Sequence, residues 1–435
     1  MWLRATRRYQ PSGSRGGLLR RRVSAGSAPV ADGPGRGIVV TALGVTQILA
    51  WGSSYYLPAV LAQPIAADTG WPLPWVVGGL SLGLLAAGLI SPCVGRAIER
   101  SGGRPVLASS SVLLAAGLAG MALAHGLPAY LAAWMVIGLG MGTGLYDAAF
   151  ATLGRLYGQG ARGAITNLTL FGGFASTVCW PLSAFLVETA GWRGACLTYA
   201  GLQLAMALPI HLALVPKRPP APVHLAAQSA TRVAAPLPRP PASMVPGRPA
   251  TFLLLAAVLT LGSVIQGVVS VHLLTVLQAQ GAELAAAGAL GALVGPSQVG
   301  ARVVEKLLGG RYHPIWTMTA STILVAAGLG LLWAGFPIMA ACLVPYGAGV
   351  GINSIARGTL PLALFGAAGY AALMGRLAAP TLIAGALAPS AGAFLLERVG
   401  AAGTLAALVA AALGNVALVA ALFLSIRQGA ARAAA

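Results

Sequence analysis

One short motif occurs twice in this chain, and its two copies lie almost half the sequence apart. Residues 184–191 read AFLVETAG and residues 393–400 read AFLLERVG, so five of eight positions are identical at an offset of 209 residues. A second pair of motifs, 142–153 and 349–360, shares two glycines and a Thr-Leu pair at an offset of 207 residues. Both pairs lie in or beside long apolar runs. The duplication therefore predicts a membrane-embedded structural unit that occurs twice in the chain as an internal repeat.

The long apolar runs indicate that most of the chain lies in a lipid bilayer. The chain is 57% hydrophobic and only 8% charged, whereas about 25% of the residues of a soluble domain are charged. Each spanning helix needs about 20 apolar residues. We therefore expect an all-α integral membrane fold with twelve transmembrane helices in two pseudo-symmetric six-helix halves. The predicted spans are 38–63, 74–95, 105–124, 128–152, 164–187, 193–215, 250–277, 284–304, 315–335, 337–358, 376–396 and 401–425.

The halves are framed by polar segments. Residues 1–37 are expected to be a disordered basic tail, although their Arg-rich, acid-poor composition also occurs in organellar transit peptides. Residues 216–249 contain ten prolines and five basic residues, which predicts an extended cytoplasmic linker. The resulting divisions are 1–37, 38–215 for the N-terminal half, 216–249, 250–426 for the C-terminal half, and a cytoplasmic tail at 427–435.

The net charge of +19 is distributed unevenly. With both termini in the cytoplasm, the basic residues outside the spans gather on the inner side, and the outer side receives only Arg193 and Arg398. This asymmetry follows the positive-inside rule, and it argues against nucleic acid as a partner. The excess of arginine over lysine, with abundant Ala and Gly, is typical of GC-rich coding. We therefore expect a multi-pass protein of a bacterial inner membrane.

The loop after the second predicted span carries a signature. It reads GRAIERSGGR over residues 95–104 and resembles the signature loop of the major facilitator superfamily. That loop has Gly, three residues, Asp, a basic residue, one residue, Gly and two basic residues. Glu99 replaces the Asp and Gly103 replaces the first of the two final basic residues. A degenerate second copy occupies residues 300–311, where the second half should have it.

The resemblance implies a transporter fold and an inner-gate loop that clasps the inner helix ends. This role is carried over to Gly95, Glu99, Arg100, Gly102, Arg104, Glu305, Lys306 and Arg311. The alternative is that the basic residues only anchor the topology at an anionic inner surface. Trp134 replaces an Arg that is usual in proton-coupled drug antiporters, and Trp180-Pro181 replaces their Gly-Pro. The segments 51–58 and 69–71 resemble monocarboxylate or oxalate/formate-type members more closely.

Two charged residues fall well inside the predicted spans. A charge in hydrocarbon is costly and tends to serve a purpose. The repeat aligns Asp147 with Ser354 and Arg357 with Phe150, so the two charges fall on nearly the same helical face of equivalent spans. We expect Asp147 and Arg357 to pair across the inner gate, or Arg357 to receive an anionic substrate. Neutralisation of each charge within its own half is the alternative.

Other candidates for a midplane site are uncharged. Histidine side chains exchange protons near neutral pH, so His272 is a candidate for a coupling proton, but a lone histidine in an apolar helix is also a common core residue. The hydrogen-bonding candidates are Gln266, Gln298 and Asn353, and the aromatic walls are Trp51, Tyr55 and Tyr56. Each of them has packing between helices as its alternative role. Arg302 and Glu305 are interpreted as a local ion pair at a helix end.

These features predict a secondary transporter that moves a small solute, with an organic anion as the first choice because of Arg357. Efflux of a drug or metalloid is the alternative within that class, and a transport-inactive sensor or scaffold is the alternative outside it. No nucleotide-binding loop, metal-spaced His/Cys cluster or catalytic triad occurs in the sequence, so we expect neither an enzyme nor a cofactor. The expected partners are a small-molecule substrate, a coupling proton and the lipid bilayer, and the expected oligomeric state is a monomer.

Overall fold

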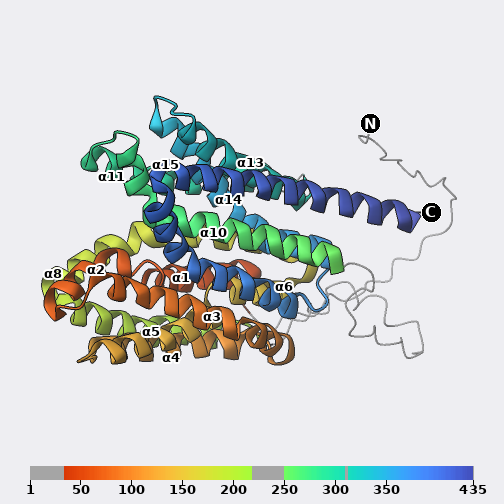
Figure 1. The fold of residues 1–435 in the computed structure, drawn as a ribbon. Helices are drawn as coiled ribbons and strands as arrows, with labels where there is room; N and C mark the ends of the chain where they lie inside the picture. Colours follow the sequence, from red (N-terminus) through yellow and green to blue (C-terminus); the bar gives the residue numbers. More distant parts are fainter. Residues whose placement is uncertain (1–33, 218–248, 309–311, 435) are drawn as a thin grey trace, which may run out of the picture. The chain divides into compact units, whose positions relative to one another are not determined.

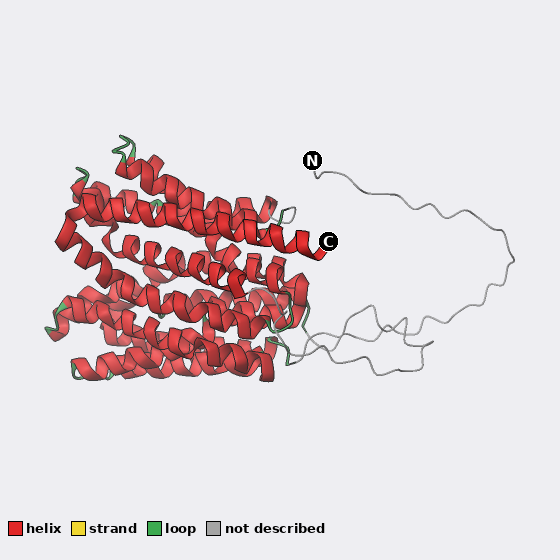
Figure 2. Cartoon of the chain, turned by 45° about the vertical axis from the view of Figure 1, so that its right-hand side comes forward, coloured by secondary structure: helices red, strands yellow, loops and turns green. Residues whose placement is uncertain are grey.

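The computed structural model describes residues 34–217, 249–308 and 312–434, and every regular element in these ranges is a helix (Figure 2). The N-terminal half contains α1 (Arg36–Gly52), α2 (Pro58–Thr69), α3 (Leu73–Ser101), α4 (Gly103–Ala122), α5 (Leu127–Gly144), α6 (Tyr146–Tyr157), the 3-10 turn Gly158–Gly160, α7 (Ala161–Gly173), α8 (Ala175–Leu202), the π-turn Gln203–Ala207 and α9 (Leu208–Leu214). The C-terminal half contains α10 (Pro249–Ala279), α11 (Leu284–Ala292), α12 (Val294–Leu308), α13 (Pro314–Trp333), α14 (Met339–Phe365) and α15 (Tyr370–Ala434). Figure 1 shows these elements in sequence colours.

The repeated motif ends at the same kind of backbone break in both halves. Gly191 has φ +68° inside α8, and Gly400 has φ +69° inside α15. A left-handed residue cannot continue an α-helix, and glycine adopts this conformation without a Cβ penalty. The two glycines of the duplicated motif therefore make equivalent turns between two helices, and the duplication extends to the backbone.

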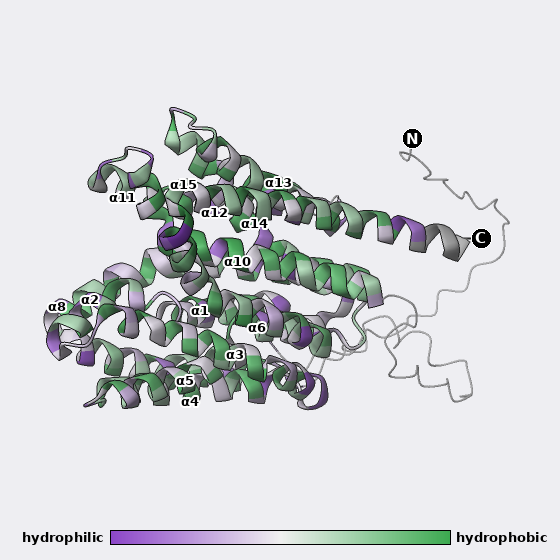
Figure 3. Ribbon diagram, viewed as in Figure 1, coloured by the Kyte–Doolittle hydropathy of each residue, from purple (hydrophilic) through white to green (hydrophobic). Residues whose placement is uncertain are grey.

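Seven helical stretches are long and apolar enough to cross a membrane: Leu73–Ser101, Gly103–Ala122, Leu127–Leu214, Pro249–Ala279, Pro314–Trp333, Met339–Phe365 and Tyr370–Gln428. Two of them, with 88 and 59 residues, are much longer than the roughly 20 residues that one crossing needs. Figure 3 shows that hydrophobic residues predominate along most of the helices. The protein is therefore a multi-pass, all-helical membrane protein.

Four spans that were predicted as single helices are broken, and one of them, 164–187, is interrupted at Phe174 between α7 and α8. The span 38–63 is interrupted before Pro58, and 284–304 is interrupted at Leu293, three residues before Pro296. In both cases the proline ring lacks an N–H and clashes with the carbonyl four residues earlier. The span 128–152 breaks at Leu145, which has φ −77° and ψ −169°. The poor helix formers Gly142 and Gly144 come just before that break.

Helices α3 and α15 approach each other closely through glycines, and this contact joins the two halves near the signature loop. A Cβ added at Gly95 would lie 2.4 Å from the Ala371 carbonyl oxygen, and one added at Gly375 would lie 2.3 Å from the Ser91 carbonyl oxygen. Small residues allow helix backbones to pack in this way inside membranes. The same end of the bundle has a mixed core in which Tyr370 packs on residues of the N-terminal half.

We expect Gly95→Ala to destabilise the protein by about 1–3 kcal/mol, because the added methyl group would overlap a backbone carbonyl across the halves. Gly78 lies on the same helix and has nothing within 4 Å of a built Cβ. Gly78→Ala should therefore be neutral or stabilising by roughly 0.5–1 kcal/mol. Thermal unfolding of both variants in detergent measures the difference. Equal melting temperatures for the two variants would refute the close contact.

Candidate functional site

The signature loop is held by contacts within its own half. Arg104 Nε donates a hydrogen bond to the Val215 carbonyl, and Arg155 donates one to the Glu99 carbonyl. Gly102 makes the turn between α3 and α4 with φ +86°. The side chain of Arg100 is exposed. These contacts fasten the ends of α6 and α9 to the loop, and Gly95 packs against Ala371 and Gly375 of the other half.

The second copy of the loop differs from the predicted arrangement. The predicted ion pair between Arg302 and Glu305 is wrong, because Arg302 points into the bundle and Glu305 Oε1 instead accepts a hydrogen bond from Thr317 Oγ1 at 2.7 Å. Lys306 is exposed, and Arg311 lies outside the described residues. The two loop copies are therefore equivalent in sequence but not in their contacts.

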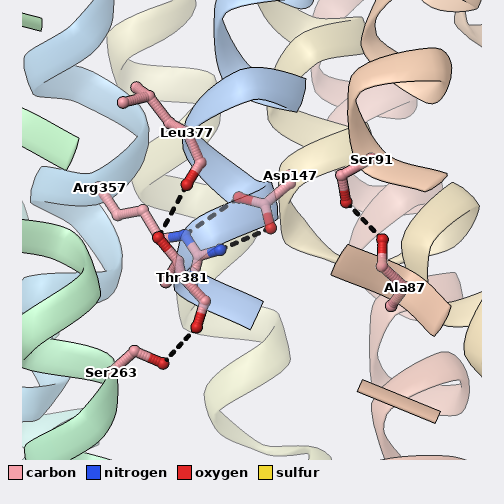
Figure 4. A network of polar contacts seen from close by, with 7 residues as sticks. All are labelled: Ala87, Ser91, Asp147, Ser263, Arg357, Leu377 and Thr381. Atoms are coloured by element: carbon pink, nitrogen blue, oxygen red, sulfur yellow. Dashed lines mark hydrogen bonds and ion pairs between the residues drawn. The ribbon is translucent and has the colours of Figure 1, made fainter. Parts of the chain in front are cut away.

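Asp147 and Arg357 form a bidentate ion pair across the two halves (Figure 4). Arg357 Nε lies 3.0 Å from Asp147 Oδ1, and Arg357 Nη2 lies 2.6 Å from Oδ2. Both side chains are mostly buried, with exposed fractions of 22% for Arg357 and 16% for Asp147. The break at Leu145 places Asp147 in the first turn of α6, where the helix dipole favours a carboxylate. In this arrangement Arg357 already has a counter-charge.

Close packing surrounds this ion pair. Gly358, the neighbour of Arg357, leaves room for Phe150 and Ile165, since a Cβ there would lie 2.7 and 2.8 Å from them. The Tyr370 hydroxyl donates a hydrogen bond to the Gly358 carbonyl at 2.6 Å. The tyrosine ring occupies the space left by Gly154. The ion pair is therefore part of a packed contact between the halves.

Arg302 is a second buried arginine, and its partners are all neutral. Its side chain is only 6% exposed. Nε donates to the Gly351 carbonyl at 3.1 Å, Nη1 donates to the Thr169 carbonyl at 2.9 Å, and Nη2 lies 3.4 Å from Gln298 Oε1. A Cβ at Gly173 would lie 2.5 Å from Nη1, so this glycine makes room for the guanidinium. Arg302 thus lies in the interior with no acidic side chain in ion-pair contact among the described residues.

An aromatic wall of the N-terminal half leads to Arg302. The Tyr146 hydroxyl donates to the Thr169 carbonyl at 3.3 Å, and this carbonyl also accepts from Arg302. The Trp51 ring lies 4.9 Å from the Tyr146 ring and packs against Tyr55 and Tyr56 as well. Trp51 Nε1 donates to Gln47 Oε1 at 3.1 Å, and the Gln47 amide donates at 2.6 Å to the Gly144 carbonyl at the break before α6. The helix break therefore positions this aromatic wall.

The remaining predicted site residues are dispersed. Gln298 lies beside Arg302, whereas Gln266 and Asn353 line a separate pocket inside the C-terminal half. His272 Nε2 lies 2.9 Å from the Pro389 carbonyl oxygen and must donate to it. Gly392 leaves room for its ring. His272 therefore has a defined hydrogen bond between helices, and its role in proton coupling stays a prediction.

A surface contact joins α2 to α8 within the N-terminal half. Asp68 accepts a hydrogen bond from Trp192 Nε1 at 2.9 Å and forms an ion pair with Arg193. The indole N–H, followed by the guanidinium, holds the pKa of Asp68 below its usual value. Both charged side chains are about half exposed, at 51% and 44%. Such a pair contributes little to stability.

No group of three or more His, Cys, Asp or Glu side chains with metal-binding geometry occurs among the described residues. The four cysteines are free thiols, three of them buried.

Comparison with known sequences identifies the family. The family model described as Major Facilitator Superfamily matches residues 43–315. Monocarboxylate transporter 11 of Mus musculus is 34% identical over 166 residues, which are 36% of this chain and 34% of the mouse protein. The match thus spans about a third of that relative. It agrees with the resemblance of the sequence to monocarboxylate-type members.

Solved structures agree on the fold. The human organic anion transporter MFSD10 (TETRAN) has a TM-score of 0.69 at 17% identity, with 89% of this chain and 100% of that chain covered. The transporter FucP in its outward conformation has a TM-score of 0.68 at 14% identity, with 88% and 99% covered. At these identities the likeness shows the fold alone. With a family model that matches well over half of its length, the chain belongs to the major facilitator superfamily of membrane transporters.

Proposed function

We propose that this protein is a secondary active transporter that moves a small organic anion by alternating access. The observation that carries this proposal is Arg302, a cation that is 6% exposed and that contacts only neutral groups among the described residues, namely two backbone carbonyls, the Gln298 amide and the Tyr146 hydroxyl. A buried charge without a counter-ion is costly, so the site is suited to a ligand that supplies the negative charge. A carboxylate is complementary to the planar guanidinium fork.

The same contact suggests how binding is linked to movement. Arg302 belongs to the C-terminal half, and the Thr169 carbonyl to which it donates belongs to the N-terminal half. An anion bound to Arg302 competes with this carbonyl and weakens one contact between the halves. The halves are then free to rock about the site while the bound anion balances the positive charge of the arginine.

The topology is part of the proposal. The turns at Gly191 and Gly400 divide the two longest apolar stretches, and twelve crossings follow when the broken helices are joined. Both termini and the arginine-rich loops face the cytoplasm of a bacterium, and the monomer contains the whole pathway. The mouse relative named as a monocarboxylate transporter, which is matched over about a third of its length, supports an anionic substrate.

Solute counterflow in proteoliposomes tests the function. Vesicles are preloaded with unlabelled lactate, benzoate, glucose, tetraphenylphosphonium or arsenite, and uptake of the matching labelled solute is followed without an ion gradient. We expect exchange with the carboxylates and none with the others. Exchange of only the sugar, the cation or arsenite would overturn the anion assignment. Carboxylate binding without exchange would instead identify a sensor.

A further inference from the structure

The aromatic wall continues into α8 through Trp180. The Trp180 ring lies 6.2 Å from the Tyr56 ring in an edge-to-face arrangement. The residue before it fixes its position, because Cys179 fills the space left by Gly52 at the end of α1. Cys179 Sγ also donates a hydrogen bond to the Ile48 carbonyl at 3.6 Å. Helix α8 is thereby packed on α1, and Trp180 is held beside the other rings of the wall.

The rings of this wall keep accessible surface. Trp180 is 45% exposed, and Trp51, Tyr55 and Tyr56 are each partly exposed. A ring that only packs between helices loses its accessible surface, as the Trp134 ring does at 1%. Adjoining rings that remain accessible are typical of a surface that binds a ligand.

Trp180 lies on the side of its helix that is turned toward Arg302. Gly173 makes room for the Arg302 guanidinium, and a Cβ added at Gly173 would also lie 3.3 Å from Val299. Phe174, between α7 and α8, keeps φ and ψ in the helical region. Trp180 follows Gly173 by seven residues, so the two share a helical face and are about 10 Å apart along the axis. The cation and the indole are therefore placed for the two ends of one small molecule.

The polar groups of the wall gather at the end that carries the cation. The Tyr146 hydroxyl contacts Arg302, and the Tyr56 hydroxyl lies within range of its charge. The other end of the wall offers the ring of Trp180 and the edge of Tyr56. A ligand that matches this wall has an anionic head and an apolar ring.

The number of positive charges limits the ligand to one carboxylate. No acidic side chain among the described residues is in ion-pair contact with Arg302, whereas Arg357 is already paired with Asp147. One carboxylate balances the charge of Arg302. A second carboxylate on the same molecule would be buried against the rings without a partner, which is costly.

We propose that the substrate is an aromatic monocarboxylate. Its carboxylate binds Arg302, and its ring packs against Trp180 and Tyr56. The inference rests on the proposed anion transport and narrows its substrate class. Aromatic rings that meet edge to face gain free energy beyond that of the area they bury, so an aryl acid is favoured over a saturated ring of similar size. A short hydroxy acid such as lactate leaves the wall uncovered.

Competition during counterflow of labelled benzoate tests the proposal in proteoliposomes of the full-length protein, with protein-free vesicles as the control for passive leak. Half-inhibition should require about 30-fold more lactate and about fivefold more cyclohexanecarboxylate than unlabelled benzoate. The dicarboxylate terephthalate should not inhibit. Equal potency of benzoate with lactate or with cyclohexanecarboxylate would overturn the aromatic assignment, and inhibition by terephthalate would overturn the limit to one carboxylate. In each case anion transport itself would stand. Absence of all carboxylate exchange would instead refute the proposed function and this inference with it.

Substitutions at Trp180 test the position of the ring. The measured quantity is the ratio of Vmax/KM for benzoate to that for lactate, which does not depend on the amount of folded protein. Trp180→Leu should lower this ratio about tenfold, whereas Trp180→Phe, which keeps an aromatic ring, should retain most of it. Trp333→Leu is the matched control, because Trp333 is 56% exposed at the end of α13, and its ratio should equal that of the wild type. An unchanged ratio in Trp180→Leu would contradict the assigned ring site.

Discussion

Replacement of Arg302 by glutamine is expected to lower the Vmax/KM of carboxylate exchange by about 100-fold. A bidentate, charge-assisted contact is roughly twice as strong as a neutral one, and each such hydrogen bond contributes about 1.5–3 kcal/mol. The loss of about 3 kcal/mol corresponds to two powers of ten. Arg302→Lys keeps the charge but loses the planar fork, so it should fall between wild type and Arg302→Gln. Counterflow of labelled lactate or benzoate measures all three proteins.

Arg427→Gln is the matched control for this prediction. It removes an arginine that is exposed and rests on the Phe423 ring at 5.6 Å, so transport should be unchanged. Arg302→Gln also removes two hydrogen bonds to carbonyls of different helices, and a melting curve separates misfolding from loss of binding. If folded Arg302→Gln exchanged carboxylate as fast as the wild type, Arg302 would not be the anion site.

Replacement of Asp147 by alanine is expected to destabilise the protein by about 3 kcal/mol, because it leaves the Arg357 guanidinium mostly buried without its counter-charge. Arg357→Gln should cost less, since the Asp147 carboxylate remains in the first turn of α6. The neutral double variant Asp147→Asn/Arg357→Gln should recover much of the loss. Thermal unfolding of the four proteins forms a double-mutant cycle, with an expected coupling energy of about 1–3 kcal/mol.

Transport by the same variants tests whether the ion pair acts as a gate. The pair joins the halves at the end that carries the arginine-rich loops, so its loss should favour opening there and slow the return step of exchange. The reversed pair Asp147→Arg/Arg357→Asp should restore part of the transport that either single charge reversal abolishes. An additive cycle, together with a reversed pair no better than the single reversals, would show that the contact has no energetic role.

The membrane character and the family of this protein were predictable from the sequence. Both depend on local or one-dimensional signals, namely the long apolar runs, the duplicated motif and the loop at 95–104. The same holds for Gly191 and Gly400, where the duplicated motif predicted equivalence and the backbone conformation agrees. The helix breaks were harder to predict from the sequence, because a membrane helix often continues through a Pro or Gly when neighbouring helices satisfy the freed backbone groups. Only the packed structure shows that Leu145 ends one helix and starts another.

The candidate site was predictable only in part. Asp147 and Arg357 were singled out because they lie deep in apolar runs, and the structure brings them into contact. Arg302 was missed because it lies near the polar end of a predicted span, with Glu305 one turn away as an apparent partner. The sequence does contain one signal, since Gln298 and Gly295 extend the polar and small residues toward the middle of that span.

The sequence by itself therefore determined that this chain lies in a lipid bilayer, that it is duplicated and to which family it belongs. Hydropathy and repeats can be recognised from the order of residues along the chain. The tertiary structure decided which buried charge is neutralised. Arg357 meets Asp147, 210 residues away, whereas Arg302 meets carbonyl oxygens, one of them 133 residues away. The energy of a buried charge depends on the groups around it in space. Such partners come from different helices and from both halves, so no pattern along the chain specifies them.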